Sequence, residues 1–198
     1  MQNKTSVINT ALMRTGAKGV NVSFQDTPAA QTANAAYQRC LDLCLSLYPW
    51  PFALRLVRLA PNADPPAFGY RRAFRLPADC LRVVDVCRPP SPDQPFPDGL
   101  EPVSYEIAGQ DILTDADAVG LSYVSNDNAQ SFPDAFADAL AWRLAFEISA
   151  YLEQGGSAKT WYELFEQALD RARVEVDAQQ SPEPAAWRSR ILSERMVD

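Results

Sequence analysis

The stretch Tyr48-Pro49-Trp50-Pro51-Phe52 divides the chain into two kinds of sequence. Before it, apolar residues recur at helical spacing, and Pro49 ends that pattern because proline cannot donate the next backbone hydrogen bond. After it, prolines are dense, since 12 of the 16 lie between Pro49 and Pro102. We therefore expect helices before this stretch and short strands after it. Three aromatic residues at a helix end are more often core than docking surface, so Tyr48, Trp50 and Phe52 are interpreted as core.

Two helices are predicted upstream. The first begins near Asn3 or Thr5, either of which can cap it, and ends near Gly16. The second begins at 26–28, where Asp and Thr precede a proline in the first turn. Each helix carries an apolar stripe, formed by Val7, Ile8, Ala11 and Leu12 in the first and by Ala33, Tyr37, Cys40, Leu41, Cys44 and Tyr48 in the second.

Strands are predicted in the middle of the chain, at 53–59, 70–76, 81–87 and 121–124. The runs at 105–107 and 111–114 flank a turn that contains Gly109, which is typical of a β-hairpin. The proline-rich segment around 89–97 is predicted to be an exposed loop.

Two more helices are predicted downstream. The third begins at 131–134 and presents one apolar face, and Gly155-Gly156 breaks it. Ser157 caps a fourth helix, whose polar face is most simply solvated. The apolar face of the third helix contains Phe136, Leu140, Leu144, Ile148 and Tyr151, and that of the fourth contains Trp161, Leu164, Phe165, Ala168 and Ala172.

The fold class that follows is α+β: a discontinuous four-helix bundle with an inserted small antiparallel β domain and an extended C-terminal tail. Residues 1–52 and 129–180 form the two halves of the bundle, because neither helix pair buries its stripe alone. Residues 53–128 form the inserted β domain, and residues 181–198 form the tail. Residues from about 4 to 48 are expected to pack with residues from about 132 to 178.

Composition limits the possible functions. The chain has 198 residues and a net charge of −7, and an acidic protein is a poor general binder of DNA phosphates. No apolar run is long enough to span a membrane, and the N-terminus does not resemble a secretory signal, so no membrane partner is expected. Arginines gather between Arg55 and Arg88, which leaves open a DNA-binding or regulatory module that uses this region.

The chain lacks the usual equipment of an enzyme. It contains no histidine, and therefore no Ser/His or Cys/His pair. Cys40, Cys44, Cys80 and Cys87 have no zinc-ligand spacing and are interpreted as buried free thiols in a reducing compartment. We expect no catalytic residue, cofactor or metal. A small hydrolase that uses Asp111 and Asp115 is the remaining enzymatic alternative, although acids that alternate in a hairpin usually face solvent.

The segment 181–198 differs from an ordinary free tail. Pro182 and Pro184 bar continuation of the fourth helix, and apolar anchors follow them among charged residues. Large aromatic and arginine side chains are the usual anchors of protein interfaces. We expect this segment to dock onto a partner, with packing on its own subunit as the alternative. The candidate docking residues are Trp187, Arg188, Arg190, Ile191, Leu192 and Arg195.

Several blocks resemble the tail tubular protein A family, the head-to-tail adaptors (connectors) of short-tailed phages. The first is the aromatic-proline-tryptophan cluster at 48–53, and the next are GYRRAFRLPADCLRV at 69–83 and YEIAGQDILTD at 105–115. An alanine-rich helix after Phe132-Pro133 and a fourth helix from near Ala158-Lys159 complete the resemblance. The proline-rich loop at 89–97 and the tail after Pro182 fall outside it.

This resemblance implies a structural protein of the virion neck, assembled in the host cytoplasm, and no catalysis. It implies a dodecameric ring that joins the portal protein to a tail or nozzle protein. The ring lines the channel through which DNA passes without sequence-specific binding. Docking of the segment 181–198 on the portal is inferred from the residues of that segment and is not part of the resemblance.

Overall fold

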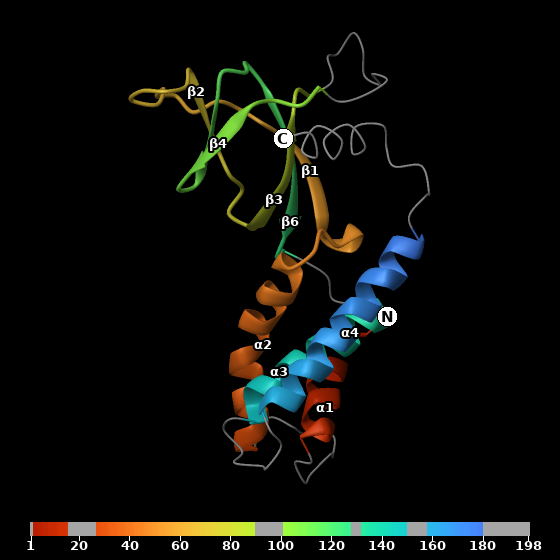
Figure 1. Cartoon of the computed structure of the whole chain (residues 1–198). Coiled ribbons are helices and arrows are strands. Elements are labelled where there is room, and N and C mark those ends of the chain that lie inside the picture. The colour runs from red at the N-terminus through yellow and green to blue at the C-terminus, as the bar shows by residue number, and fades with distance from the viewer. Residues whose placement is uncertain (1, 16–26, 90–100, 128–131, 150–157, 180–198) are drawn as a thin grey trace. The chain divides into compact units, whose positions relative to one another are not determined.

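The computed structural model describes residues 2–15, 27–89, 101–127, 132–149 and 158–179. These residues divide into two compact units. A helical unit comes from residues 1–53 and 127–179, and a β unit comes from residues 54–126. Figure 1 shows the helices and strands of each unit.

The first two helices begin at side chains that cap them. Helix α1 (Lys4–Arg14) has Asn3 as its N-cap, and the Asn3 side chain accepts a hydrogen bond of 2.9 Å from the Ser6 amide. Helix α2 (Pro28–Ser46) has Thr27 as its N-cap, with Pro28 in the first turn. The predicted start of α2 is confirmed, and Asn3 rather than Thr5 caps α1. The predicted stripes of both helices are buried, apart from a half-buried Tyr48.

Helix α3 (Asp134–Ser149) contacts each of the other three helices, including α4 (Ala158–Gln179). Its interior positions are buried, among them Phe136, Leu140, Leu144 and Ile148. Ion pairs join α3 to the first two helices, between Arg14 and Asp138 and between Arg39 and Glu147. The segments before and after the β unit therefore pack with one another in a single helical unit (Figure 1).

The aromatic stretch after α2 belongs to the core of the helical unit. Trp50 is fully buried, and its ring lies edge-on to Phe136 with centroids 5.0 Å apart. Phe52 contacts both Phe132 and Phe136, and a short 3₁₀ helix, η2 (Pro51–Ala53), leads from this cluster into the β unit. The core interpretation is confirmed for Trp50, whereas Tyr48 and Phe52 are half-buried.

The β unit consists of two three-stranded antiparallel sheets. In the first, β6 (Val119–Ser125) lies between β1 (Leu54–Leu59) and β3 (Cys80–Cys87). In the second, β5 (Asp111–Thr114) lies between β2 (Arg72–Arg75) and β4 (Tyr105–Ala108). Gly109 has a φ of +63° in the turn of the β4–β5 hairpin, a conformation that glycine adopts without strain. Both sheets contain strands that are distant in sequence.

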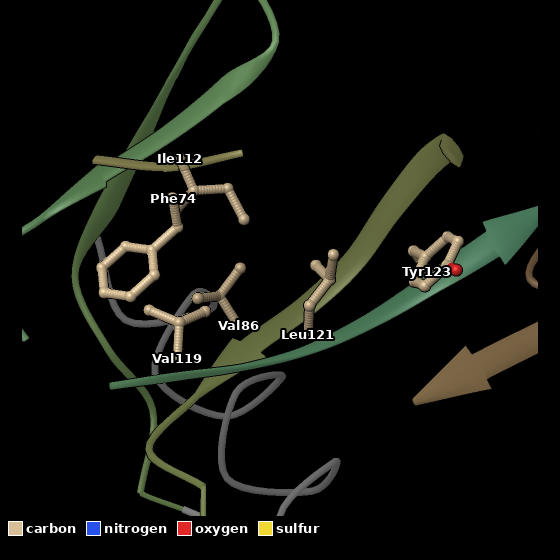
Figure 2. Close-up of a cluster of buried hydrophobic side chains, with 6 residues drawn as sticks. All are labelled: Phe74, Val86, Ile112, Val119, Leu121 and Tyr123. Carbon is tan, nitrogen blue, oxygen red and sulfur yellow. The ribbon is translucent and has the colours of Figure 1, made fainter. Parts of the chain in front are cut away.

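The two sheets share one hydrophobic cluster (Figure 2). Phe74 and Ile112 come from the second sheet, and they point toward Val86, Val119 and Leu121 of the first. Val119, Leu121 and Tyr123 alternate along β6, so they lie on the same face of the strand. Inward faces of both sheets thereby build a small core for the β unit.

The mixed α+β class is confirmed, with four helices and two small antiparallel sheets in the described residues. The predicted strands and hairpin all occur, and their ends differ from the predicted ones by at most two residues. Residues 181–198, and the proline-rich loop beyond Pro89, lie outside the described residues.

Candidate functional site

The candidate docking residues from the sequence are all outside the part of the chain that the structure describes. They are Trp187, Arg188, Arg190, Ile191, Leu192 and Arg195. Among the described residues, the β unit contains both a concentration of arginines and exposed large apolar side chains.

Carboxylates accompany the arginines of the second sheet. Arg72 donates two hydrogen bonds, of 2.9 and 2.7 Å, from Nε and Nη2 to one oxygen of Asp117. Arg71 donates from its backbone amide to Asp115 Oδ1 at 2.9 Å, and its guanidinium donates to the Asp115 carbonyl oxygen at 2.8 Å. These pairs hold the start of β2 and the residue before it against the segment after β5.

Two further pairs follow the same pattern. Arg75 Nη1 lies 3.6 Å from Asp111 Oδ1, and these two residues are cross-strand neighbours of β2 and β5. Arg88 Nε lies 3.3 Å from Glu101 Oε2. The hydrogen bond and positive charge of Arg72 lower the pKa of Asp117, with smaller contributions from Arg71 and Arg88. The carboxylates of the β unit are thus placed where they neutralise its arginines.

A hydrogen-bonded network surrounds Asp79 at the start of β3. Ser125 Oγ donates to Asp79 Oδ2 at 2.5 Å, and the Tyr123 hydroxyl donates to the same carboxylate at 3.2 Å. Arg55 Nη1 of β1 lies 3.7 Å from Asp79 Oδ2. Burial alone would raise the pKa of Asp79, but these hydrogen bonds, one from its backbone and the charge of Arg55 together lower it. One carboxylate therefore links all three strands of the first sheet.

The two carboxylates of the hydrolase alternative have separate arginine partners. Asp111 pairs with Arg75 and accepts a hydrogen bond of 3.3 Å from Asn62 Nδ2, whereas Asp115 pairs with Arg71. This geometry suits ion pairs that hold a sheet together.

The thiols are in their protonated form at neutral pH. Burial raises the pKa of Cys40 and of Cys87 to about 11, and it raises the pKa of Cys44 further. Cys80 is half-buried, and its pKa is also raised by burial and by the charge of Asp79. A protonated thiol is a poor nucleophile. The interpretation as buried free thiols is confirmed for Cys40, Cys44 and Cys87.

Within the described ranges, no group of three or more Cys, Asp or Glu side chains is placed to hold a metal ion. The helices in those ranges also include none with both the length and the apolar character that a membrane span requires.

The surface of the β unit carries exposed apolar side chains and a groove. Phe68 is 88% exposed, Leu56 is 79% exposed and Ile107 is 47% exposed. The groove has a volume of about 410 Å³ and lies between the start of β3 and the β4–β5 turn. Its lining includes Leu76, Cys80, Leu81, Arg82, Val83 and Ile107.

Sequence reasoning did not select these exposed residues. Phe68 follows Pro65-Pro66 and precedes Gly69, and an aromatic residue among loop-forming residues is a signal that could have identified it. Leu56 offered no such signal, because β1 reads LRLVRL and places apolar residues on both faces. A scan against protein-family models found no model that matches this chain, and a search of curated proteins found no match either.

Proposed function

We propose that this chain is a structural subunit of a phage neck, a head-to-tail adaptor that forms a dodecameric ring between the portal and the tail. In this proposal the helices form a four-helix bundle interrupted by the β unit. DNA passes through the ring without sequence-specific binding, and the subunit carries out no catalysis. The proposal rests on the sequence blocks that resemble the adaptor family and on their order along the chain.

The positions of these blocks in the fold support the proposal. The cluster at 48–53 lies where the helical unit ends and the β unit begins, and Trp50 is its buried centre. The block at 69–83 covers β2 and the start of β3, and the block at 105–115 covers the β4–β5 hairpin. Each block therefore corresponds to a structural element or a junction, as expected of residues that maintain a shared architecture.

The charges of the β unit favour passage of DNA over a DNA-binding module. Its described residues contain seven arginines and eight aspartates and glutamates. Five of the arginines have a carboxylate within 4.0 Å, namely Arg55, Arg71, Arg72, Arg75 and Arg88. A paired guanidinium must give up its carboxylate before it can bind phosphate, so this region is a weaker electrostatic trap than its arginine count suggests. We expect the channel wall to be neutral or acidic.

The segment 181–198 is the proposed contact with the portal. Its argument is the sequence alone: Trp187, Ile191 and Leu192 provide apolar anchors, and three arginines lie among them. If it orders only on contact, the entropy that this ordering costs is offset only when a portal surface is present. Subunits would then remain unassembled until the portal is available.

Electron microscopy of the purified full chain, with and without the portal of the same phage, tests the proposal. We expect closed rings, either free or on the portal. A chain truncated after residue 180 should keep the melting temperature of the full chain but lose attachment to the portal, and Trp187→Ala should lose part of it.

Two results would contradict these expectations in different ways. A full chain that stays monomeric beside an intact portal would refute the adaptor function. A truncated chain that melts well below the full chain would show instead that the segment 181–198 packs on its own subunit, and the docking hypothesis alone would fail.

A further inference from the structure

Phe68 is the most exposed of the large apolar side chains in the described residues. It lies in the loop between β1 and β2, with 88% of its surface open to solvent. An exposed phenylalanine holds a large apolar surface in water. Covering that surface with a partner lowers the free energy. The ring is therefore available for contact with another molecule.

The loop holds Phe68 in a restricted position, because both of its ends are tied to the second sheet. The Asn62 amide donates to the Ala73 carbonyl oxygen at 2.8 Å, and the Arg71 amide donates to Asp115 Oδ1 at 2.9 Å. Between these ties, Pro65-Pro66 restricts the backbone and Gly69 has a φ of +91°. A restricted loop loses less entropy when its aromatic side chain binds.

The groove at the start of β3 has the size and chemistry to receive such a ring. Its volume of about 410 Å³ exceeds that of one phenyl group, and its lining combines Leu76, Leu81, Val83 and Ile107 with Arg82. The charges also match, since Asp64 is on the same loop as Phe68 and Arg82 lines the groove. Phe68 of the same chain does not fill the groove, because its side chain is exposed.

We propose that Phe68 of one copy of this chain inserts into the Leu76–Ile107 groove of the next copy. The projecting ring and the receiving groove are different surfaces of one chain, so the contact is head-to-tail and each copy can both give and receive it. Such a contact generates a closed ring when the rotation from one copy to the next, repeated around the ring, adds up to a full turn. This inference rests on the proposed ring and specifies which side chains hold neighbouring subunits together.

Cys80 makes the contact directly testable, because this native thiol lines the groove and is half-buried. In a Phe68→Cys variant, the new thiol of one copy would meet Cys80 of the next. The other native thiols, Cys40, Cys44 and Cys87, are buried. The full-length variant is assembled alone or on the portal, oxidised with copper phenanthroline, and separated on a non-reducing gel.

Three matched controls accompany it. The Phe68→Cys/Cys80→Ser variant removes the receiving thiol, and wild type lacks the added one. Leu56→Cys places a thiol at an exposed position of β1 that the proposed contact does not use. A melting curve of each variant shows whether the fold is kept, which is expected because Phe68 and Leu56 are exposed.

We expect Phe68→Cys to give a ladder of dimers and larger species, at least tenfold more than any control. A ladder that persists after Cys80→Ser, an intramolecular disulfide without a ladder, or a yield no higher than that of Leu56→Cys would overturn the contact. If rings form but the cross-link does not, the contact is refuted and the adaptor function is not. Cross-linked chains that never close into rings would support the contact and refute the adaptor function.

Discussion

The indole Nε1–H of Trp50 donates a hydrogen bond of 2.9 Å to the carbonyl oxygen of Cys44, in the last turn of α2. The last carbonyl groups of a helix lack partners within the helix, so a donor from the following segment stabilises its end. Trp50 thereby fixes the point at which the chain leaves the helical unit.

Replacing Trp50 should separate its two contributions. Trp50→Phe keeps an aromatic ring but removes the donor, and should lower the free energy of unfolding by roughly 1–3 kcal/mol. Trp50→Ala also removes the buried ring and should lower it by about 3–5 kcal/mol. Urea denaturation followed by far-ultraviolet circular dichroism measures both. Equal losses for the two variants would mean that the ring contacts contribute little.

Leu144 tests the core of the helical unit, because its side chain is fully buried on α3. Leu144→Ala should lower the free energy of unfolding by roughly 2–5 kcal/mol. Val174→Ala on α4 is the matched control, since Val174 is largely exposed and should change stability by less than about 0.5 kcal/mol. A small effect of Leu144→Ala would place this residue outside the core.

Asp79 should make the stability of the β unit depend on pH. Its pKa is lowered in the folded state, so its carboxylate adds stability above the pKa of the unfolded chain. That contribution is lost as pH falls through the lowered folded pKa. Asp79→Asn should therefore be less stable than wild type by up to about 2 kcal/mol near neutral pH, with a difference that shrinks below about pH 4.

Asp117→Asn is the control for this pH dependence. The pKa of Asp117 is also lowered, chiefly by Arg72, but Asp117 is exposed and solvent screens the pair. Its effect on stability should be smaller than that of Asp79→Asn near neutral pH. An Asp79→Asn curve parallel to that of wild type from pH 2 to pH 7 would contradict the role given to the Asp79 network.

Removing the carboxylates that follow β5 should turn the β unit into a DNA binder. The double variant Asp115→Asn/Asp117→Asn removes the carboxylates that pair with Arg71 and Arg72. Duplex DNA should then bind more tightly, and the slope of log K against log salt should steepen by about 2. Fluorescence anisotropy between low and physiological salt measures this slope.

The matched control removes the same charge elsewhere. Glu166→Gln/Glu175→Gln changes two exposed residues of α4 that have no ion pair to a described residue. This variant should leave the slope unchanged. If wild type already binds duplex DNA as tightly as Asp115→Asn/Asp117→Asn, the carboxylates do not shield the arginines, and a DNA-binding role becomes the better hypothesis.

The order of thiol modification should follow burial. Cys80 is half-buried, so it should react first with a chromogenic disulfide reagent in the native protein. Cys40, Cys44 and Cys87 should react only after urea unfolding, because they are buried and burial raises their pKa. If the folded Cys80→Ser variant still reacted rapidly with the reagent, this order would be contradicted.

Local chemistry explains why much of the fold was predictable. Asn3, Thr27 and Pro28 are short-range signals that act within one helical turn, so the starts of α1 and α2 follow from a few residues. Pro49 likewise prevents α2 from continuing, and the helix ends just before it, at Ser46. Strand positions follow from apolar runs between prolines and glycines.

The pairing of strands was not predictable in the same way. Nothing near Val119 indicates that β6 will lie between β1 and β3, because each pairing depends on residues far along the chain. The division into two sheets and the pairing of Arg72 with Asp117 also depend on residues that are far apart in the sequence. The exposure of Phe68 also depends on tertiary contacts, which a loop signal alone does not specify.

The pairing of β1 with β6 has a consequence for how the chain folds. Leu54, the first residue of the β unit, lies opposite Val124, near its last residue. When these strands pair, they close a loop of about 70 residues and bring the two chain ends that lead to α2 and α3 near each other. A β unit that forms early would thus reduce the loop-closure entropy that the two helical segments must otherwise overcome to meet. The same closed loop would allow a β unit of another length to replace this one with little effect on the helices.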